Sequence, residues 1–201
     1  MDTHERAIKM TRAYTLKRRA EQQAETRRRI VEAALDLHSS VGPALTTFSM
    51  VAEQAGVQRH TLYAHFPDER SLYLACSGLS VERDPLPDAE AWRGLTPRER
   101  LRAGLRAIYD WYDRNAGLAA CVLRDAEHHA LTREMVELRF GARMAAYHEV
   151  LGAKLNTKQR AMLHLALSFS AWRALVRESG LKQKAAVEAM VQAIGCDKDS
   201  D

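Results

Sequence analysis

Apolar residues recur at helical spacing along most of the chain, and no segment alternates with the period of two that is typical of β-strands. Glycine and proline are scarce, with 10 and 5 residues among 201. A hydrophobic fraction of 46% supplies enough apolar surface for a core. The pattern therefore predicts an all-α protein.

The shortest helices of this pattern lie between residues 46 and 66. Thr47 can cap a first helix, and Gly56 is placed to end it, because glycine enters the left-handed backbone region at little cost. A second short helix over residues 58–65 places Leu62 on its inner face. Two helices joined by so tight a turn are typical of a helix-turn-helix unit, which lays its second helix in a DNA groove.

The outer face of the second helix is polar. It carries six side chains with hydrogen-bonding or amphipathic groups: Gln58, Arg59, His60, Thr61, Tyr63 and His65. Such groups suit phosphate oxygens and base edges. Helical hairpins with a solvated face also occur in proteins that never contact DNA, so the spacing alone leaves both interpretations open.

The residue order V-A-x-x-A-G-V-x-x-x-T-L-Y-x-H-F over residues 51–66 resembles the DNA-binding domain of the TetR (tetracycline repressor) family of bacterial transcription regulators. The resemblance covers residues 26–76 and includes the preceding helix, which Gly42 ends. It implies a three-helix helix-turn-helix domain over residues 25–76, followed by a larger helical domain over residues 84–195 that binds a ligand and dimerises.

The resemblance also implies which side chains contact DNA. The set is Thr47, Ser49, Gln58, Arg59, His60, Thr61, Tyr63, His65 and Arg70. Within it, Arg59, His60 and Thr61 occupy the positions that usually meet bases and adjacent phosphates. Tyr63 and His65 match positions that typically contact phosphates.

Three positions depart from the family pattern. His60 stands where a small residue is common, and it is bulky and can titrate near neutral pH. Gln58 replaces the usual serine cap and is a poorer one. Glu69 stands where a lysine is common, which leaves Arg70 as the nearest substitute. These departures leave the DNA sequence that the protein reads open.

Positive charge is concentrated at the N-terminus. Residues 1–29 carry nine Lys or Arg against four Asp or Glu, whereas the rest of the chain has 21 against 22. We expect residues 1–24 to form a basic, flexible arm. Such an arm can follow phosphates or enter a minor groove, and the alternative is a solvated tail.

The second half of the chain reads as a linker rich in proline and a series of longer helices. The pattern predicts a connecting helix near residues 69–82, a helix that starts at Thr96, and helices over residues 118–129, 131–153, 157–178 and 181–194, with a tail over residues 196–201. Thr96, Pro97 and Glu99 form the start signal of the second of these helices.

By the resemblance, the middle helices enclose a pocket for a small effector. Ten residues at helical spacing are candidates for its lining: Trp111, Tyr112, Cys121, His128, Met135, Phe140, Met144, Tyr147, Phe169 and Trp172. A mostly apolar cavity with a few polar groups suits a hydrophobic or aromatic molecule. The alternative is that these residues form ordinary core.

The helix over residues 157–178 is apolar around nearly its whole circumference, so it needs packing partners on two sides, and one of them can be a second subunit. TetR-family regulators dimerise through their last two helices. The candidate interface residues are Leu163, Leu167, Ala171, Ala174, Val187, Met190 and Ile194. A two-fold dimer would place two recognition helices in successive major grooves of a palindromic operator.

Other functional classes find less support. The segment over residues 125–129 gathers an aspartate, a glutamate and two histidines, but only Asp125 and His129 share a helical face, and no catalytic motif is present. We therefore expect no catalytic residue, metal ligand or cofactor. A redox sensor built on Cys76, Cys121 or Cys196 stays an alternative, as does a metal-responsive regulator.

Three widely separated cysteines fit a reducing compartment, and the first residues resemble no signal peptide. The most apolar segment is too short for a membrane span. The hypothesis from the sequence is a cytoplasmic, nucleoid-associated homodimer that represses transcription. A small ligand would release it from its operator, and the connecting helix would pass the movement to the DNA-binding heads.

Overall fold

The computed structural model describes residues 3–195, with side chains from Tyr14 onward except that of Thr15. Within these residues the chain forms helices and no strand, which confirms the all-α prediction. The N-terminal unit is built from α1 (Thr3–Ser40), η1 (Pro43–Leu45), α2 (Phe48–Gln54), α3 (Arg59–His65) and α4 (Glu69–Arg83).

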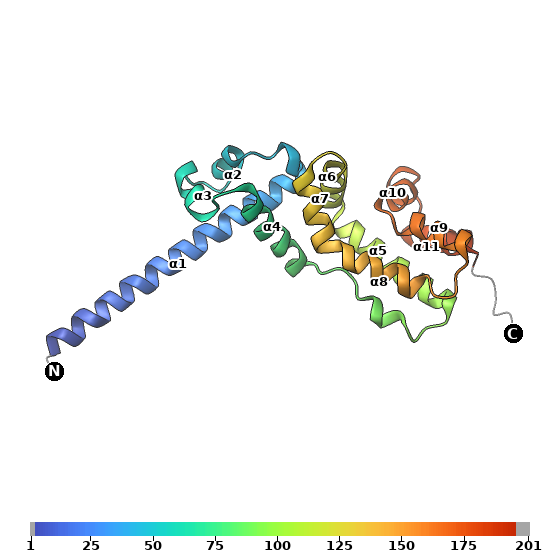
Figure 1. Cartoon of the computed structure of the whole chain (residues 1–201), viewed down its shortest axis with the longest axis horizontal. Coiled ribbons are helices and arrows are strands. Elements are labelled where there is room, and N and C mark those ends of the chain that lie inside the picture. The colour runs from blue at the N-terminus through green and yellow to red at the C-terminus, as the bar shows by residue number, and fades with distance from the viewer. Residues whose placement is uncertain (1–2, 196–201) are drawn as a thin grey trace.

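The C-terminal unit contains the remaining helices and two π-helical turns. They are η2 (Ala89–Trp92), α5 (Pro97–Arg114), α6 (Ala116–Ala126), α7 (Ala130–Val136), the π-turn η3 (Glu137–Gly141), α8 (Ala142–Leu151), α9 (Thr157–Leu167), α10 (Phe169–Trp172), the π-turn η4 (Arg173–Glu178) and α11 (Gln183–Ile194). Figure 1 shows this unit at one end of an elongated molecule, with α4 leading into it from the N-terminal unit. None of the described helices has the length and apolar character that crossing a bilayer requires.

Helix α1 differs from the predicted flexible arm. It is one helix of 38 residues, and its first half extends as a rod away from the rest of the molecule (Figure 1). Residues 3–24 contain no glycine or proline and many Ala, Glu, Gln, Lys and Arg, which are good helix formers. The charge of this segment suggested a flexible arm, whereas its residue types favour a continuous helix. The first residue of α1 that joins a core is Ile30.

The N-terminal unit has its own core. Five almost completely buried residues pack together in it: Ile30 and Ala34 of α1, Leu62 of α3, Phe66 just after α3, and Leu72 of α4. The local signals read from the sequence are confirmed here. The Thr47 hydroxyl caps α2 by accepting a hydrogen bond from the Met50 amide at 3.3 Å, and Gly56 ends the helix with a φ of 63°. Gln58 precedes α3 without a side-chain capping bond.

Helix α5 begins as predicted, with Thr96 and Glu99 forming a capping box. The predicted helix over residues 157–178 is wrong, because the chain breaks at Ser168 and resumes as α10. Two buried tyrosines of α5 donate hydrogen bonds to backbone carbonyls at the C-terminal end of α9. The Tyr109 hydroxyl donates to Ala166 O at 3.0 Å, and the Tyr112 hydroxyl donates to Leu167 O at 2.7 Å. The single helix predicted over residues 131–153 likewise contains a π-turn, at residues 137–141.

The prediction for the dimer interface is mostly wrong. Five of the seven candidates are buried within the chain itself: Leu163, Leu167, Ala171, Val187 and Ile194. Helices α5, α8 and α11 pack against α9 and bury Leu163, Ala166 and Leu167, whereas Ala161 and Leu165 of α9 are exposed. Ala174 is exposed and Met190 is partly buried.

Candidate nucleic-acid interface and ligand cavity

Helix α3 is held rigidly by the N-terminal unit and turns its polar face outward. Leu62 and Phe66 anchor it in the core, while Arg59, His60 and Tyr63 are exposed. Thr61 and His65 are partly buried at the edges of this face. The exposed helix can therefore present a guanidinium, an imidazole and a phenol to a partner without unfolding anything.

The start of α2 lies beside this face. Thr47 and Ser49 are exposed at its N-terminus, and the Phe48 and Tyr63 rings are 5.1 Å apart. The amide groups at a helix N-terminus are suited to a phosphate. We name the combined set the α3 surface; its members are Thr47, Ser49, Gln58, Arg59, His60, Thr61, Tyr63 and His65.

Two arginines of α1 support this surface from behind. Arg27 Nη1 donates to the His65 carbonyl at 3.1 Å, and its guanidinium lies 4.1 Å from the centre of the Phe66 ring. Arg29 donates to the carbonyls of Ala55 and Gly56. These carbonyls lie at the C-termini of α3 and α2, where cations are favourable. Part of the basic N-terminal excess thus stabilises the unit itself.

Arg70, also predicted to contact DNA, lies on α4 in an ion pair. Its guanidinium donates to Glu134 Oε1 at 2.7 Å and 3.0 Å, which joins α4 to α7. This exposed ion pair lies at the junction between the two units, and the contact of Arg70 with DNA stays a prediction. Asp125 makes a second link across this junction, since its Oδ2 accepts from the Ala44 amide at 2.9 Å.

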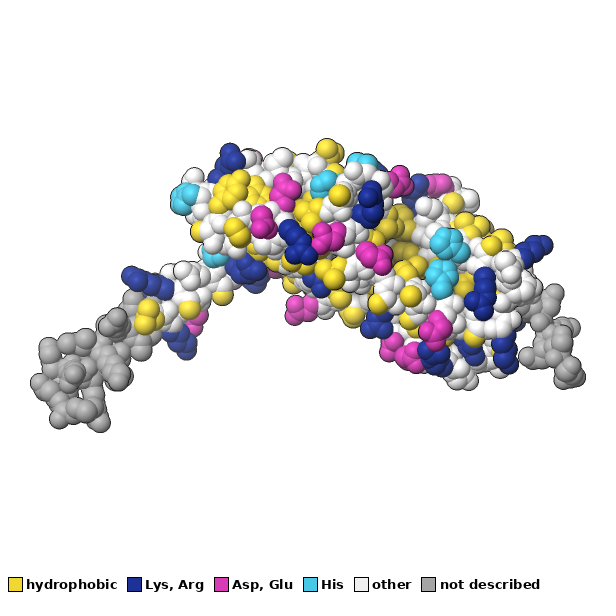
Figure 2. Space-filling model, viewed as in Figure 1, with side chains coloured by type: hydrophobic (Ala, Val, Ile, Leu, Met, Phe, Trp, Pro, Cys, Tyr) yellow, Lys and Arg dark blue, Asp and Glu magenta, His cyan; other side chains and the backbone are white. Residues whose placement is uncertain are grey.

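A largely apolar cavity of about 340 Å³ lies between the two units. Its walls come from α1 and α4 on one side and from α5, α6, the α7–η3–α8 segment and the α9–α10 corner on the other. Figure 2 shows a hollow with apolar side chains at its base between the lobe with α6 and α7 and the lobe with α9 and α10. The volume is within the range of small-molecule sites, which begins at about 300 Å³.

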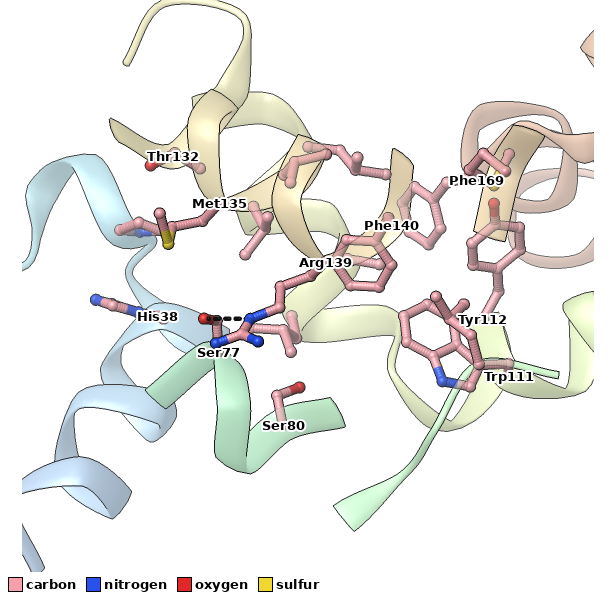
Figure 3. A pocket seen from close by; sticks show the side chains of 18 of the residues that line it. His38, Ser77, Ser80, Trp111, Tyr112, Thr132, Met135, Arg139, Phe140 and Phe169 are labelled. Atoms are coloured by element: carbon pink, nitrogen blue, oxygen red, sulfur yellow. Dashed lines mark hydrogen bonds between the residues drawn. The ribbon is translucent and has the colours of Figure 1, made fainter. Parts of the chain in front are cut away.

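Six of the ten predicted lining residues do line this cavity: Trp111, Tyr112, Met135, Phe140, Met144 and Phe169. The labelled aromatic members gather at one end, as Figure 3 shows. The Trp111 and Phe140 rings are 5.8 Å apart, and the Tyr112 and Phe169 rings 5.4 Å. Helical spacing found these residues because the cavity follows the inward stripes of α5, of the α7–η3–α8 segment and of α10.

The other four candidates lie elsewhere. Cys121 packs at the α1–α6 contact with its Sγ 3.6 Å from Ser39 O, and Tyr147 donates its hydroxyl to Pro87 O at 2.7 Å. Trp172 is completely buried in the core. His128 is exposed. These residues share the apolar or mixed character of a lining, but the sequence does not show which neighbour covers each of them.

Several lining residues were missed by the sequence analysis. The polar ones among them are His38, Tyr73, Ser77, Ser80, Thr132, Arg139, His164, Ser168 and Ser170. Arg139 falls between the apolar stripes of the predicted helix over residues 131–153 and reads there as a solvated position. The contributions of α1 and α4 were missed because the cavity was expected within the C-terminal domain alone.

The alternatives based on cysteine and metal gain no support from the described residues. Burial raises the pKa of the Cys76 thiol to about 12, so it stays protonated and unreactive at neutral pH. Cys121 is buried as well, and Cys196 lies outside the described residues. Among the side chains that the structure describes, those of residues 14 and 16–195, no three His, Cys, Asp or Glu are grouped as metal ligands would be.

His38 lies where α1 meets the cavity, and its side chain is only 4% exposed. Its Nδ1 is 3.5 Å from Cys76 Sγ, and its ring is 4.8 Å from that of Tyr73. Burial lowers the pKa of His38 to about 4, the Asp125 carboxylate opposes this shift, and His129 adds to it. His38 is therefore neutral at pH 7.

We expect stability to decrease as the pH falls from about 7 to 5, because the unfolded chain protonates His38 in this range and the folded chain does not. The unfolded state then binds more protons, and the slope contributed by one such group is at most about 1.4 kcal/mol per pH unit. Denaturant titrations across this range measure it. The His38→Leu variant should show a flatter dependence, and the exposed His128→Gln control should follow the wild type. A wild-type slope in His38→Leu would contradict the assignment.

The comparisons with known proteins agree with this geometry. Residues 30–76 match the family model described as bacterial regulatory proteins, tetR family. The HTH-type transcriptional repressor KstR of Mycolicibacterium smegmatis is 34% identical over 106 residues, which make up 52% of this chain and 52% of that protein. The chain thus spans about half the length of the curated relative it matches.

Solved structures match over more of the chain. A HlyIIR mutant protein superposes with a TM-score of 0.65 at 16% identity, covering 89% of this chain and 100% of that one. A TetR-like transcriptional regulator from Rhodococcus sp. RHA1 superposes with a TM-score of 0.60 at 21% identity, covering 84% and 93%. At such identities these two likenesses concern the fold alone. Residues 30–76 therefore match the DNA-binding domain of the TetR family of bacterial regulatory proteins, and the chain shares its fold with a TetR-like regulator.

Proposed function

We propose that this protein is a sequence-specific DNA-binding regulator of transcription, acting as a repressor in the bacterial cytoplasm, at the nucleoid. The observation that carries the proposal is the α3 surface: a short helix, fixed by Leu62 and Phe66, that exposes Arg59, His60 and Tyr63. Arginine can read guanine in the major groove, and the flanking polar groups suit phosphates. The relative KstR, which aligns with half of the chain, is named a transcriptional repressor.

The proposed active form is a homodimer. Helices α9 and α11 pack against each other, and each carries apolar side chains that are exposed or, at Ala189, partly buried. We name these the α9–α11 face: Ala161 and Leu165 on α9, and Ala185, Ala189 and Ala193 on α11. Leu165 is 49% exposed, and the i, i+4 spacing keeps each set on one side of its helix. Small residues allow a second pair of helices to approach closely, so a second copy of the chain is the proposed partner.

Release by a small effector is proposed to act through the cavity. Because its walls include α1 and α4 as well as the C-terminal helices, a ligand would contact both units at once. A ligand weakens DNA binding if it favours a relative placement of the two units that differs from the DNA-bound one. By thermodynamic linkage, DNA then weakens ligand binding by the same factor. The Arg70–Glu134 and Asp125–Ala44 links are the contacts that such a movement would strain.

Selection from a pool of random duplexes tests the proposal, with the purified full chain at moderate ionic strength. The expected result is enrichment of one motif with two-fold symmetry and a binding affinity that falls steeply with salt, because basic groups displace counterions from phosphates. Uniform recovery of all sequences would contradict sequence-specific regulation.

A further inference from the structure

The cavity lining is apolar except around one charged side chain. Arg139 is the only Asp, Glu, Lys or Arg among the described residues that line it. Ser77 and Ser80, one turn apart on α4, are the polar neighbours drawn beside it in Figure 3. Placing a guanidinium next to an apolar cavity costs free energy unless its N–H groups donate to hydrogen-bond acceptors.

Only part of the Arg139 guanidinium is satisfied. Its Nε donates to Ser77 Oγ at 3.1 Å, and its Nη2 donates to Leu74 O at 2.9 Å, whereas a guanidinium has five N–H donors. Over the described part of the chain, no carboxylate lies within ion-pairing distance of Arg139, in contrast to Arg102 and Arg143, which each have one. The positive charge beside the cavity therefore has no counter-charge among the side chains that the structure describes.

The backbone aims this charge toward the cavity. Arg139 is in the π-turn η3, which inserts an extra residue between α7 and α8, and such turns are frequent at functional sites. In Figure 3, Arg139 reaches toward Ser77 with His38 on one side and Phe140, Trp111 and Phe169 on the other. The site thus has a cationic centre and an aromatic end.

We propose that the cavity binds an elongated apolar carboxylic acid. Its carboxylate pairs with Arg139 beside Ser77, and its apolar body extends over Trp111, Phe140 and Phe169. A carboxylate supplies both the missing counter-charge and two acceptors in the geometry that a guanidinium favours. The apolar body fills the remainder of the cavity, where it displaces water from aromatic and aliphatic surface.

This assignment names the effector class for the proposed function, and it also offers a path to α4. Both present acceptors of Arg139, Ser77 Oγ and Leu74 O, belong to that helix. A ligand carboxylate that pairs with the remaining N–H groups draws the Arg139 guanidinium away from these two acceptors, which loosens the contact between η3 and α4. Helix α4 follows α3 and Phe66 directly, so its displacement is transmitted to the α3 surface.

The test compares two probes with the same tail, decanoate and 1-decanol, on the purified full chain without DNA. Tryptophan fluorescence reports binding, because Trp111 lines the cavity. The wild type should bind decanoate at least roughly tenfold more tightly than 1-decanol, because hydrogen bonds between two charged groups are stronger than those to a neutral hydroxyl. Arg139→Met should lose this preference and keep its affinity for 1-decanol.

Two further variants complete the test. Arg143→Met removes an exposed arginine of α8 that pairs with Asp88 outside the cavity, and it should keep the wild-type preference. Arg139→Lys keeps the charge and should retain part of the preference, which also serves if Arg139→Met does not fold. Equal binding of the two probes by the wild type, failure of both to bind, or a preference that survives in Arg139→Met would overturn the proposal. Because no DNA is present, these results are independent of the selection experiment on the proposed function.

Discussion

Replacing Arg59 and Tyr63 together by alanine is expected to weaken binding to the selected duplex by at least about 100-fold. An arginine that reads a base contributes about 1–3 kcal/mol, and a symmetric dimer loses each contact twice. Both side chains are on the outer face of α3, and Tyr63 is 46% exposed, so their loss leaves the core intact. Fluorescence anisotropy with the selected duplex, and with a scrambled duplex of equal length, measures the change.

The matched control for this pair is Arg143→Ala, which removes an exposed arginine far along the chain, on α8. It should bind the selected duplex like the wild type. The affinity of the Arg59→Ala/Tyr63→Ala double variant for the scrambled duplex should change less than its affinity for the selected one, because base contacts rather than phosphate contacts give the preference. If the double variant kept the wild-type preference between the two duplexes, α3 would not be the reading helix.

A charge on the α9–α11 face is expected to have a comparable effect without touching the DNA-binding unit. Leu165→Glu places a carboxylate from each subunit in an apolar interface, where unpaired charges are strongly unfavourable. The protein should become a monomer, as measured by analytical ultracentrifugation. Operator affinity should then fall by roughly 100-fold or more, because the two DNA-binding units are no longer linked and each binds its half-site alone.

Leu138→Glu is the matched control for this substitution. Leu138 is 55% exposed and lies on η3, away from the α9–α11 face, so it offers the same chemical change at another site. This variant should remain dimeric and bind DNA like the wild type. A Leu165→Glu protein that is still dimeric would show that the second copy packs against a different surface.

The N-terminal unit could be predicted closely because its signals are local. Thr47 caps α2, Gly56 turns the backbone and Leu62 marks the inner face, and each of these acts within a few residues. The helices therefore begin and end close to the predicted residues. The roles of Arg27 and Arg29 could not be found this way, because the carbonyls they bind come from other helices.

The C-terminal unit was less predictable because its irregularities depend on tertiary contacts. The break at Ser168 is matched by hydroxyl groups from Tyr109 and Tyr112, more than fifty residues earlier in the chain. Periodicity showed that α9 is apolar on all sides, but it could not show which of its residues α5 and α11 of the same chain cover. Arg139 was overlooked for a related reason, since a single charge in an apolar pattern looks like a position open to solvent.

The central claim is that two copies of α3, one from each subunit, read two half-sites of one duplex. Hydroxyl-radical footprinting of the selected duplex tests it most directly. The account predicts two protected segments related by two-fold symmetry, with centres about 10 base pairs, or a multiple of this, apart. The Arg59→Ala/Tyr63→Ala variant should lose both segments together. A single protected segment, or protection that does not depend on the sequence of the duplex, would contradict the account.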